Sequence, residues 1–432
     1  MTLGDSPVRV ALLGCGVVGS QVARILIEQA DDLRARVGRP LELVGIGVRR
    51  TIDRPGIDAA LFTTDLKGLV GRDDVDLVVE LIGGIHPALE LLLTAVGGGK
   101  SVVTANKALL AQYGVELFEA AAEAEVDVFY EAAVAGAIPI VRPLRESLVG
   151  DAITAVKGIV NGTTNYILDQ IHTHGSTFAQ ALAEAQQLGY AEADPTADVE
   201  GHDAAAKAAI LASLAFHTRV RLADVECEGI TSITTDDIAA AEQLRCVVKL
   251  LAQCSLSPDG TLAVGVYPTL VPLEHPLAGI HGAYNAIFIE SVNAGRLMFM
   301  GPGAGGSPTA SAVLGDVVIA ARNRVRGVTG HGESAYTSPG ITDPGQVVSR
   351  YYLALTVTDQ PGVLARVAEA MASHGVSIAA VRQEEAAANG DTARLGITTH
   401  RAPDASIRAV VDQLTSGSDV RGDVRVLRVE GA

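Results

Sequence analysis

The sequence predicts a doubly wound parallel α/β domain, then a mixed α+β domain, then a small C-terminal domain of ferredoxin-like βαββαβ topology. Three observations support this fold class. Short β-branched runs alternate with helical segments in the first third of the chain, mixed runs fill the middle, and a segment rich in Gly, Ser, Thr and Pro precedes the last unit. The 432 residues are enough for roughly two to four domains.

The first domain is expected to span residues 1–138. Five strand-like runs are separated by Ala/Leu/Glu-rich segments: VRVALLG, LELVGIGVR, VDLVVELIG, KSVVTA and VDVFYEA. Strand and helix repeated in this way indicate a parallel sheet covered on both faces. A later helix over residues 308–326, which begins at a proline suited to a first helical turn, is expected to pack back on this domain.

The second domain, residues 139–326, is expected to bind substrate, carry catalytic residues and mediate oligomerisation. It contains a strand-like AITAVKGIV, a very apolar helix from about His202 to His217, and the later strand-like runs LAVGVYPTLV and AIFIESV. Residues 327–350 are expected to form a linker. The third domain, residues 351–432, shows strand, helix, two strands, helix and strand in that order.

Composition and charge argue against several classes of protein. Apolar residues make up 48% of the chain and charged residues 19%, which favours compact globular domains over disorder. The net charge of −17, without a cluster of basic residues, argues against nucleic acid as a partner. The four cysteines lack CxxC spacing, no signal peptide is expected, and no apolar run reaches the length of a membrane span. We therefore expect a soluble cytoplasmic protein with no membrane partner.

A glycine-rich turn follows the first predicted strand and matches the GxGxxG fingerprint of dinucleotide-binding domains. Its first glycine would permit the tight turn, its second would let a pyrophosphate approach the backbone, and its third would let helix and strand pack closely. The pyrophosphate would lie at the N-terminus of the next helix. Such motifs arise by chance, but the position between a strand and an amphipathic helix favours a Rossmann-type nucleotide site. The residues of the motif are Gly14, Cys15, Gly16, Val17, Val18 and Gly19.

Two arginines end the second predicted strand, where NAD-selective sites usually carry an acidic residue. Arg49 and Arg50 would instead suit the 2′-phosphate of NADP, although a solvated strand end explains them equally well. NADP is therefore favoured over NAD. Nucleotide binding alone does not predict redox chemistry, because Rossmann-type domains also occur in proteins that only sense ligands.

The segment GYAEADPTADVEGHDAAAKAAIL carries the most chemical information in the chain. Asp203 and Lys207 lie four residues apart on a predicted helix and so share one face. A surface ion pair is the ordinary explanation of such a pair. Here, however, Lys207 is the only formally charged residue between Asp203 and Arg219, so we expect a buried, partnered lysine. Such a lysine could supply a proton or a positive charge to a carbonyl oxygen, with Asp203 orienting it.

Other polar residues are weaker candidates. Glu192, on the loop before this helix, could bind a substrate ammonium group or be a solvated loop acid. Thr104 and Lys107 fall at the carboxyl edge of the predicted sheet, where ligands of such folds bind, although a lysine at a helix start is commonly only solvated. The polar turn 161–165 could bind substrate or cap a helix, and the GPGAGGSP segment, which includes Gly306, could approach a nicotinamide or form a connector.

Taken together, these segments resemble homoserine dehydrogenase over essentially the whole chain. Six motifs occur in the order and at the spacing of that family: GCGVVG, VVTANKALLA, YEAAVAGAIP, GIVNGTTNYIL, GYAEADPTADVEGHDAAAKAAIL and GAGGSPTASAV. The resemblance implies NAD(P)H-dependent reduction of L-aspartate 4-semialdehyde to L-homoserine, a step toward threonine, methionine and isoleucine. The chain is too short to include the aspartate kinase fused to some members, so the monofunctional form is expected.

The resemblance also implies roles for individual residues. It implies Lys207 as the catalytic acid/base, with Asp203 as its partner. Lys107 would lie where cofactor and substrate meet, in a second catalytic role. The residues implied to line the substrate site are Glu192, Thr163 and Tyr190.

A monovalent cation, commonly sodium, is implied in the YEAAVAGAIP loop. The ligands would be Glu131 and the backbone carbonyls of Val134, Gly136 and Ile138. One carboxylate with several carbonyl oxygens suits a hard cation. From the residues alone, Glu131 would be interpreted only as an acid at a strand end.

The C-terminal unit is similar to an ACT domain in two stretches, DQPGVL from Asp359 and SHGVSI from Ser373. Such domains bind amino acids, typically where two copies pair. The similarity therefore implies threonine as a feedback effector, and a homodimer or homotetramer is expected. Coupling to a distant active site needs two states that bind threonine differently, and the sequence shows no such pair of states.

Two alternatives stay open. The chain could be another NAD(P)-dependent enzyme that acts on a small amino-acid aldehyde, or a non-catalytic sensor of nucleotide and amino acid built from similar domains. The pair of Asp203 and Lys207 on an apolar helix argues against the sensor, because buried and partnered lysines are typical of functional sites.

Overall fold

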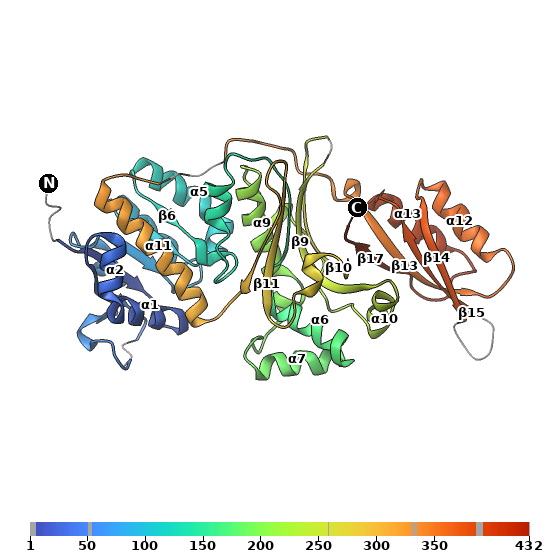
Figure 1. The fold of residues 1–432 in the computed structure, drawn as a ribbon, viewed down its shortest axis with the longest axis horizontal. Coiled ribbons are helices and arrows are strands. Elements are labelled where there is room, and N and C mark those ends of the chain that lie inside the picture. Colours follow the sequence, from blue (N-terminus) through green and yellow to red (C-terminus); the bar gives the residue numbers. More distant parts are fainter. Residues whose placement is uncertain are drawn as a thin grey trace. The chain divides into compact units, whose positions relative to one another are not determined.

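The computed structural model describes residues 6–50, 54–257, 259–330, 332, 335–385 and 392–431. Contacts within the chain divide it into two compact units (Figure 1). Unit 1 comprises Met1–Val156, Ala206–Val225 and Tyr284–Ser338, and unit 2 comprises Lys157–Ala205, Glu226–Ala283 and Pro339–Ala432. Each unit is therefore assembled from segments that are distant in the sequence.

Unit 1 contains a six-stranded, fully parallel sheet in the order β3-β2-β1-β4-β5-β6. The chain reverses its direction of winding between β1 and β4, which is where doubly wound sheets bind ligands. The predicted Rossmann-type fold is confirmed, and the structure adds β3, a strand of two residues that is too short to produce a periodic pattern. The strands are β1 (Val8–Leu13), β2 (Leu41–Gly47), β3 (Phe62–Thr63), β4 (Leu77–Glu80), β5 (Ser101–Thr104) and β6 (Val128–Phe129).

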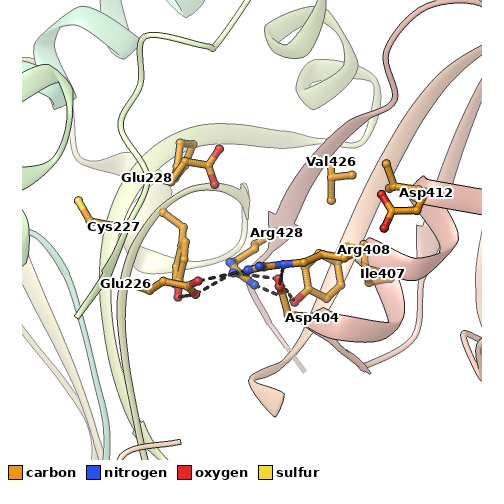
Figure 2. Close-up of a pocket in the computed structure, with 13 residues that line it drawn as sticks. Glu226, Cys227, Glu228, Asp404, Ile407, Arg408, Asp412, Val426 and Arg428 are labelled. Atoms are coloured by element: carbon orange, nitrogen blue, oxygen red, sulfur yellow. Dashed lines mark hydrogen bonds and ion pairs between the residues drawn. The ribbon is translucent and has the colours of Figure 1, made fainter. Parts of the chain in front are cut away.

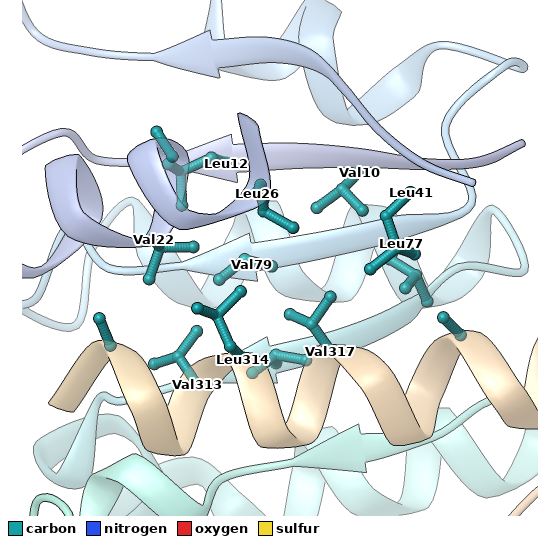
Figure 3. Packing of buried hydrophobic residues seen from close by; sticks show 14 of the residues in the cluster. Val10, Leu12, Val22, Leu26, Leu41, Leu77, Val79, Val313, Leu314 and Val317 are labelled. Carbon is teal, nitrogen blue, oxygen red and sulfur yellow. The ribbon is translucent and has the colours of Figure 1, made fainter. Parts of the chain in front are cut away.

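Five helices connect these strands, and a sixth comes from far along the chain. The connecting helices are α1 (Val17–Glu28), α2 (Ala30–Val37), α3 (Leu66–Gly71), α4 (Ala88–Gly97) and α5 (Lys107–Glu123). In the sixth, α11 (Gly306–Arg326), Val313 and Val317 point toward the sheet in one core cluster with Val79 of β4 (Figure 3). Helix α11 begins two residues before Pro308, which still lies in the first turn, where a backbone N–H has no intrahelical acceptor.

Unit 1 also contains an antiparallel hairpin. It is formed by β11 (Tyr284–Ser291) and β12 (Gly295–Pro302), paired from Tyr284 with Pro302 to Ser291 with Gly295. Strand β12 leads directly into the glycine-rich segment that precedes α11. The hairpin therefore fixes one end of that segment, and the core helix fixes the other.

The first part of unit 2 combines helices with a long antiparallel pair. Strands β9 (Cys246–Leu256) and β10 (Leu262–Pro272) pair along their whole length, and the short β8 (Glu226–Cys227) runs parallel to β10. The sequence analysis did not predict β9. The helices are α6 (Gly162–His174), α7 (Phe178–Gln187), α8 (Thr196–Val199) and α10 (Thr235–Gln243).

The apolar helix predicted from His202 to about His217 is α9 (His202–Ala215). The helix ends earlier than expected, and His217 lies just beyond its end with a positive φ of 52°. Although α9 is strongly apolar, neither it nor any other helix in the described ranges is long and apolar enough to cross a membrane.

The C-terminal part of unit 2 has the predicted βαββαβ order, and the ACT fold is confirmed. Its four main strands lie in the order β17-β13-β15-β14, and β17 also pairs in parallel with β10. The sheet of the ACT domain therefore continues the sheet of β9 and β10. The elements are β13 (Val348–Thr358), α12 (Val363–Ser373), β14 (Ile378–Glu385), β15 (Thr392–Thr399), β16 (Ala402–Pro403), α13 (Asp404–Ser416) and β17 (Arg425–Val429).

Candidate active site and nucleotide site

Two glycines of the GxGxxG turn are required by packing. Gly14 has a φ of +101°, and a Cβ atom there would lie 2.6 Å from the carbonyl oxygen of Leu81. A Cβ atom on Gly19 would lie 2.1 Å from the carbonyl oxygen of Gly14, so only glycine lets α1 approach the turn. The backbone N–H of Gly14 donates to Gly47 at 2.8 Å and fixes the turn to β2.

The middle of the turn is open, in contrast to its two ends. A Cβ atom on Gly16 would meet no atom within 4 Å, so packing inside the chain does not require glycine there. Val17 is 74% exposed, although it is apolar, whereas Val18 packs against the core. Gly16 is also the N-cap of α1 and leaves the helix without a side-chain cap. Free N–H groups beside an open glycine fit the pyrophosphate of a dinucleotide.

A second helix begins at the same place. A Cβ atom on Gly306 would lie 2.9 Å from Cγ1 and 3.2 Å from the carbonyl oxygen of Val17, so α11 starts in contact with the first turn of α1. Its N-cap, Gly305, has a φ of +122° and likewise provides no side-chain cap. Two uncapped helix N-termini therefore lie together, and their dipoles both favour an anionic group.

Arginines flank this site. Arg49 and Arg50, which follow β2 rather than ending it as predicted, are exposed. A third, Arg54, was missed by the sequence analysis: its Nη2 donates to the carbonyl oxygen of Cys15 at 3.1 Å, inside the glycine turn. The sequence signal that could have indicated Arg54 is the group of three arginines between positions 49 and 54, shortly after β2. Burial raises the pKa of the Cys15 thiol, so this cysteine stays protonated.

Thr104 and Lys107 lie at the carboxyl edge of the sheet. The Thr104 hydroxyl donates to Glu80 Oε2 at 2.5 Å and accepts the backbone N–H of Asn106 at 3.0 Å. The other oxygen of the fully buried Glu80 accepts the backbone N–H of Gly83. The Thr104 side chain therefore orders this edge, and the cofactor contact expected of it stays a prediction. Lys107 follows the N-cap Asn106 as the first residue of α5 and is partly buried.

In unit 2 the structure brings together Thr163 and Tyr190, two of the residues predicted for the substrate side, beside the helix cap Asn161. Asn161 caps α6 by accepting the backbone N–H of Thr164 at 2.9 Å. The Thr163 hydroxyl donates to the carbonyl oxygen of Tyr190 at 2.7 Å, which fastens the 189–195 loop to the start of α6. The Tyr190 ring, 47% exposed, lies against Tyr166 with centroids 5.1 Å apart. Asn161 therefore caps α6, and Thr163 fixes the loop that carries Tyr190.

One buried amide links two carboxylates of the same region. Asn161 Nδ2 donates to Asp198 Oδ1 at 2.7 Å and to Asp203 Oδ2 at 3.0 Å, and its side chain is almost fully buried. Asp203 is the second residue of α9, and Lys207 follows one turn later on the same face. Lys207 is 9% exposed, as its apolar surroundings predicted. Asn161 lies in a motif that the sequence analysis noted without assigning the residue a role.

Glu192 lies on the exposed loop that Thr163 fastens to α6. Its own backbone carbonyl accepts a hydrogen bond from Gln186 Nε2 at 3.0 Å, which holds the backbone while the carboxylate stays exposed to solvent. The backbone of the loop is therefore held at Tyr190 and at Glu192. A carboxylate on it remains accessible to an incoming cationic group, and its expected role stays a prediction.

In the loop expected to bind a cation, the Glu131 side chain is held by the backbone, and the cation itself stays a prediction. The Glu131 carboxylate is buried and accepts the backbone N–H groups of residues 140–142 at 2.5, 2.8 and 3.0 Å. Three N–H donors already satisfy this carboxylate, so ion binding would fall mainly to the carbonyl oxygens expected as ligands, those of Val134, Gly136 and Ile138. Carbonyl oxygens are suitable donors for a hard monovalent cation.

Two residues beside this loop were missed by the sequence analysis. Asp316 of α11 accepts the backbone N–H of Glu131 at 2.8 Å and forms an ion pair with Arg142 at 2.7 Å. Burial and the neighbouring Glu131 raise the pKa of Asp316 to about 7. These three residues tie the loop to the core helix across 185 positions of sequence, a contact that no local pattern encodes.

Comparison with known proteins agrees with this arrangement. Three family models match the chain in succession: the NAD binding domain of homoserine dehydrogenase over residues 14–131, homoserine dehydrogenase over 139–318, and the ACT domain over 351–416. The homoserine dehydrogenase of Mycobacterium tuberculosis is 54% identical, with 99% of this chain and 98% of that protein covered. That of Corynebacterium glutamicum is 52% identical, with 98% and 96% covered.

Solved structures that resemble this chain come from the same family. A homoserine dehydrogenase from Thiobacillus denitrificans has a TM-score of 0.92 at 37% identity, with 98% of both chains covered. A hyperthermophilic archaeal homoserine dehydrogenase, solved in complex with NADPH, has a TM-score of 0.62 at 29% identity and covers 73% of this chain and 98% of its own. The chain therefore belongs to the homoserine dehydrogenase family of NAD(P)-dependent oxidoreductases, and it carries a C-terminal ACT domain.

Proposed function

We propose that this chain reduces L-aspartate 4-semialdehyde to L-homoserine and so serves the synthesis of threonine, methionine and isoleucine. The observation that carries the proposal is the buried lysine of α9, one turn after an aspartate that a buried amide holds in place. Carbonyl reduction needs a positive charge or a proton at the oxygen, and a lysine in an apolar helix is a strong source of both.

The roles of the side chains follow from their positions. A bound nicotinamide would supply the hydride, which the protein residues cannot provide. Lys207 would stabilise the developing negative charge on the carbonyl oxygen and donate the proton, while Asp203 orients its ammonium group. Glu192 would bind the substrate ammonium, and Lys107 would assist where substrate and cofactor meet. Thr163 and Tyr190 would shape the loop that carries Glu192.

We infer that NADP is the preferred cofactor. Arg49 and Arg50 follow β2 without an acidic residue at the strand end, and Arg54 reaches the glycine turn itself. Guanidinium groups favour a 2′-phosphate, whereas the ribose hydroxyls of NAD favour a carboxylate. The archaeal relative solved with NADPH supports the same preference. A monovalent cation, sodium being the candidate, would be held by the carbonyls of Val134, Gly136 and Ile138 beside Glu131.

For regulation and assembly we propose threonine as an effector acting through the ACT domain, and a homodimer or homotetramer. The ACT fold supports an amino-acid ligand. Exposed apolar residues on the β11–β12 hairpin, Tyr284, Met298 and Met300, offer a surface that a second copy could cover. Light scattering would give the oligomeric state, and a monomer at all concentrations would contradict this part of the proposal.

The decisive assay follows the oxidation of NADPH with L-aspartate 4-semialdehyde, with acetaldehyde as a matched aldehyde that lacks the amino-acid group. We expect turnover with the semialdehyde only. Turnover of both aldehydes at similar kcat/KM would favour the broader aldehyde reductase, and binding of NADPH without any turnover would favour the sensor. Repeating the assay with NADH and with sodium replaced by choline tests the two cofactor proposals.

A further inference from the structure

A polar side chain that is buried normally has a hydrogen-bond or ion-pair partner, because burial removes it from water. A pocket lined by β8, β10 and the ACT domain follows this rule (Figure 2). The buried guanidinium of Arg428 lies 3.7 Å from the centroid of the Tyr267 ring there and contacts Asp404 at 3.1 Å. A buried side chain that lacks such partners therefore needs an explanation.

Asn285, the second residue of β11, does not follow this rule. Its side chain is 1% exposed, and neither its Nδ2 nor its Oδ1 has a hydrogen-bond partner within the described part of the chain. A donor and an acceptor are therefore both unpaired in the interior of unit 1. A leucine has the same branched shape and would fill this position without that cost. The amide is best explained by a second state of the protein in which it is paired.

The amide is covered by the glycine-rich segment 301–306. A Cβ atom on Gly303 would lie 2.0 Å from Asn285 Nδ2 and 2.6 Å from Oδ1, so the Gly303 backbone lies directly against the amide. The other side of Gly303 is packed on the loop that follows β6, because a Cβ atom on Gly136 would lie 2.3 Å from the Gly303 carbonyl oxygen. This carbonyl oxygen therefore faces Gly136, and the amide meets the backbone without hydrogen bonding to it.

The segment is fixed at both ends but not in its middle. At one end Pro302 pairs with Tyr284, and its carbonyl oxygen accepts the backbone N–H of Ala137 at 3.1 Å. At the other end α11 begins at Gly306. Residues 303–305 between them belong to neither a helix nor a strand. Two of these three residues are glycines, so their peptide groups can rotate at little steric cost.

The same segment ends at the nucleotide site. Gly305 is the N-cap of α11 and provides no side-chain cap, and Gly306 contacts Val17 in the first turn of α1. An anionic group bound at these two helix N-termini attracts the N–H groups at the start of α11. A bound phosphate therefore acts on backbone that lies only a few residues after Gly303.

We propose that Asn285 is a positioning residue for the nucleotide site. When the nucleotide binds, residues 303–305 turn so that their backbone hydrogen-bonds the Asn285 amide, and this pairing holds the start of α11 on the pyrophosphate. In the nucleotide-free protein the amide is buried and unpaired, so pairing it in the bound state strengthens binding. The inference rests on the nucleotide binding of the function proposed above, and it is independent of which aldehyde is reduced.

The test is calorimetric titration of the full-length protein with NADPH. Asn285→Leu keeps the branched shape without the polar atoms, and Asn285→Ala is a second variant that cannot overfill the site. We expect both to bind NADPH about tenfold to a hundredfold more weakly than wild type. The matched control is Asn323→Leu, because Asn323 Nδ2 donates to Asp127 Oδ2 at 2.9 Å near the other end of α11. The control is expected to leave NADPH binding unchanged.

Thermal unfolding without nucleotide separates this role from a structural one. Asn285→Leu should unfold at the temperature of wild type or above it, since an apolar group replaces an unpaired amide. Asn323→Leu should unfold at a lower temperature, because Asp127 loses a hydrogen-bond donor. A midpoint of Asn285→Leu that falls as far as that of Asn323→Leu would show that the amide is already paired in the free protein, and would overturn the proposal.

Hydrogen exchange then tests the pairing itself. NADPH should slow the exchange of the backbone amides of residues 303–305 more in wild type than in Asn285→Leu, and equal slowing counts against the proposal. An NADPH affinity of Asn285→Ala equal to that of wild type overturns it as well. A wild type that binds neither NADPH nor NADH overturns the nucleotide site together with this inference, whereas unchanged affinity in the variants overturns this inference alone.

Discussion

Two lysines of this chain are each buried within an apolar run of sequence, but the groups around their ammonium ends differ. Lys207 lies in AAAKAAI on α9, and Lys249 lies in VVKLLAQ on β9. Their exposed fractions are 9% and 2%. Lys249 donates to the Asn165 side-chain oxygen at 3.0 Å and to the carbonyl oxygen of Ile280 at 2.6 Å, and burial lowers its pKa to about 8.

Burial alone therefore does not identify a catalytic lysine. Lys249 holds α6 and the loop at Ile280 to β9, so its hydrogen-bond donors are used for structure. Lys207 stands one turn after Asp203, whose carboxylate is fixed by the buried amide of Asn161. Lys249 also has a carboxylate near it, that of Asp169, which raises its pKa. The feature that separates the lysine proposed for chemistry is therefore its position one helical turn after the aspartate that Asn161 holds.

The largest expected effect separates the two lysines by turnover. Lys207→Met is expected to lower kcat by about 10²- to 10⁴-fold, because the carbonyl oxygen loses its proton donor and its positive partner. Lys249→Met should change kcat by less than about tenfold, a barrier change of about 1.4 kcal/mol. Both rates are measured with NADPH and the semialdehyde, at a temperature where circular dichroism shows each variant folded. Equal losses in the two variants would remove the distinction.

The next effect concerns stability and pH at Lys249. Its pKa is about 8 in the folded protein and 10.5 ordinarily, so between these values the unfolded chain binds a proton that the folded chain has lost. The contribution of Lys249 to stability is therefore least favourable below about pH 8 and improves as pH rises to 10.5. Relative to Lys249→Met, the wild type should gain up to about 3 kcal/mol across this range.

Urea unfolding of both proteins at several pH values measures this difference directly. Groups that titrate identically in the two proteins cancel from the comparison. A difference in unfolding free energy that stays constant from about pH 8 to 10.5 would show that Lys249 is protonated in the folded state throughout. The lysine would then be stabilised by Asn165 and Ile280 more strongly than burial destabilises it.

Local patterns were sufficient to predict much of this molecule. The parallel sheet, the C-terminal βαββαβ domain and the glycine turn were predicted because their signals lie within a few residues, as at Gly14 and Gly19. The burial of Lys207 followed from its apolar neighbours. The apolar run VVKLLAQ carries the same signal, because it likewise surrounds Lys249 with apolar residues and so predicts its burial.

Contacts between distant segments could not be predicted from the sequence. The hydrogen bond of Thr104 to Glu80 depends on the register of β4 beside β5, and no motif specifies that register. Arg54 reaches the glycine turn only because the chain returns after β2. From the residues alone Glu131 is interpreted as an acid at a strand end, and only the fold shows that its carboxylate accepts three backbone N–H groups.

The smallest effects are expected at two asparagines near the start of α6. Asn161 holds Asp203, which precedes Lys207, and Asn165 accepts a hydrogen bond from Lys249. Asn161→Ala removes the hydrogen bonds that hold Asp198 and Asp203, so kcat/KM should fall about tenfold while Asp203 becomes misoriented. Asn165→Ala removes an acceptor from Lys249 and a donor from Ile280, and it should lower the unfolding free energy by about 1–3 kcal/mol with kcat/KM nearly unchanged.

Both substitutions lie within the first turn of α6 or at its cap, so general loss of that helix would affect them alike. Asn161→Ser keeps a cap on the helix but cannot reach two carboxylates at once, and it is the matched control for capping. If Asn161→Ser restores stability without restoring kcat/KM, the amide acts through Asp203. If it restores both, the effect of Asn161 is only that of a helix cap, and the positioned carboxylate no longer distinguishes Lys207 from Lys249.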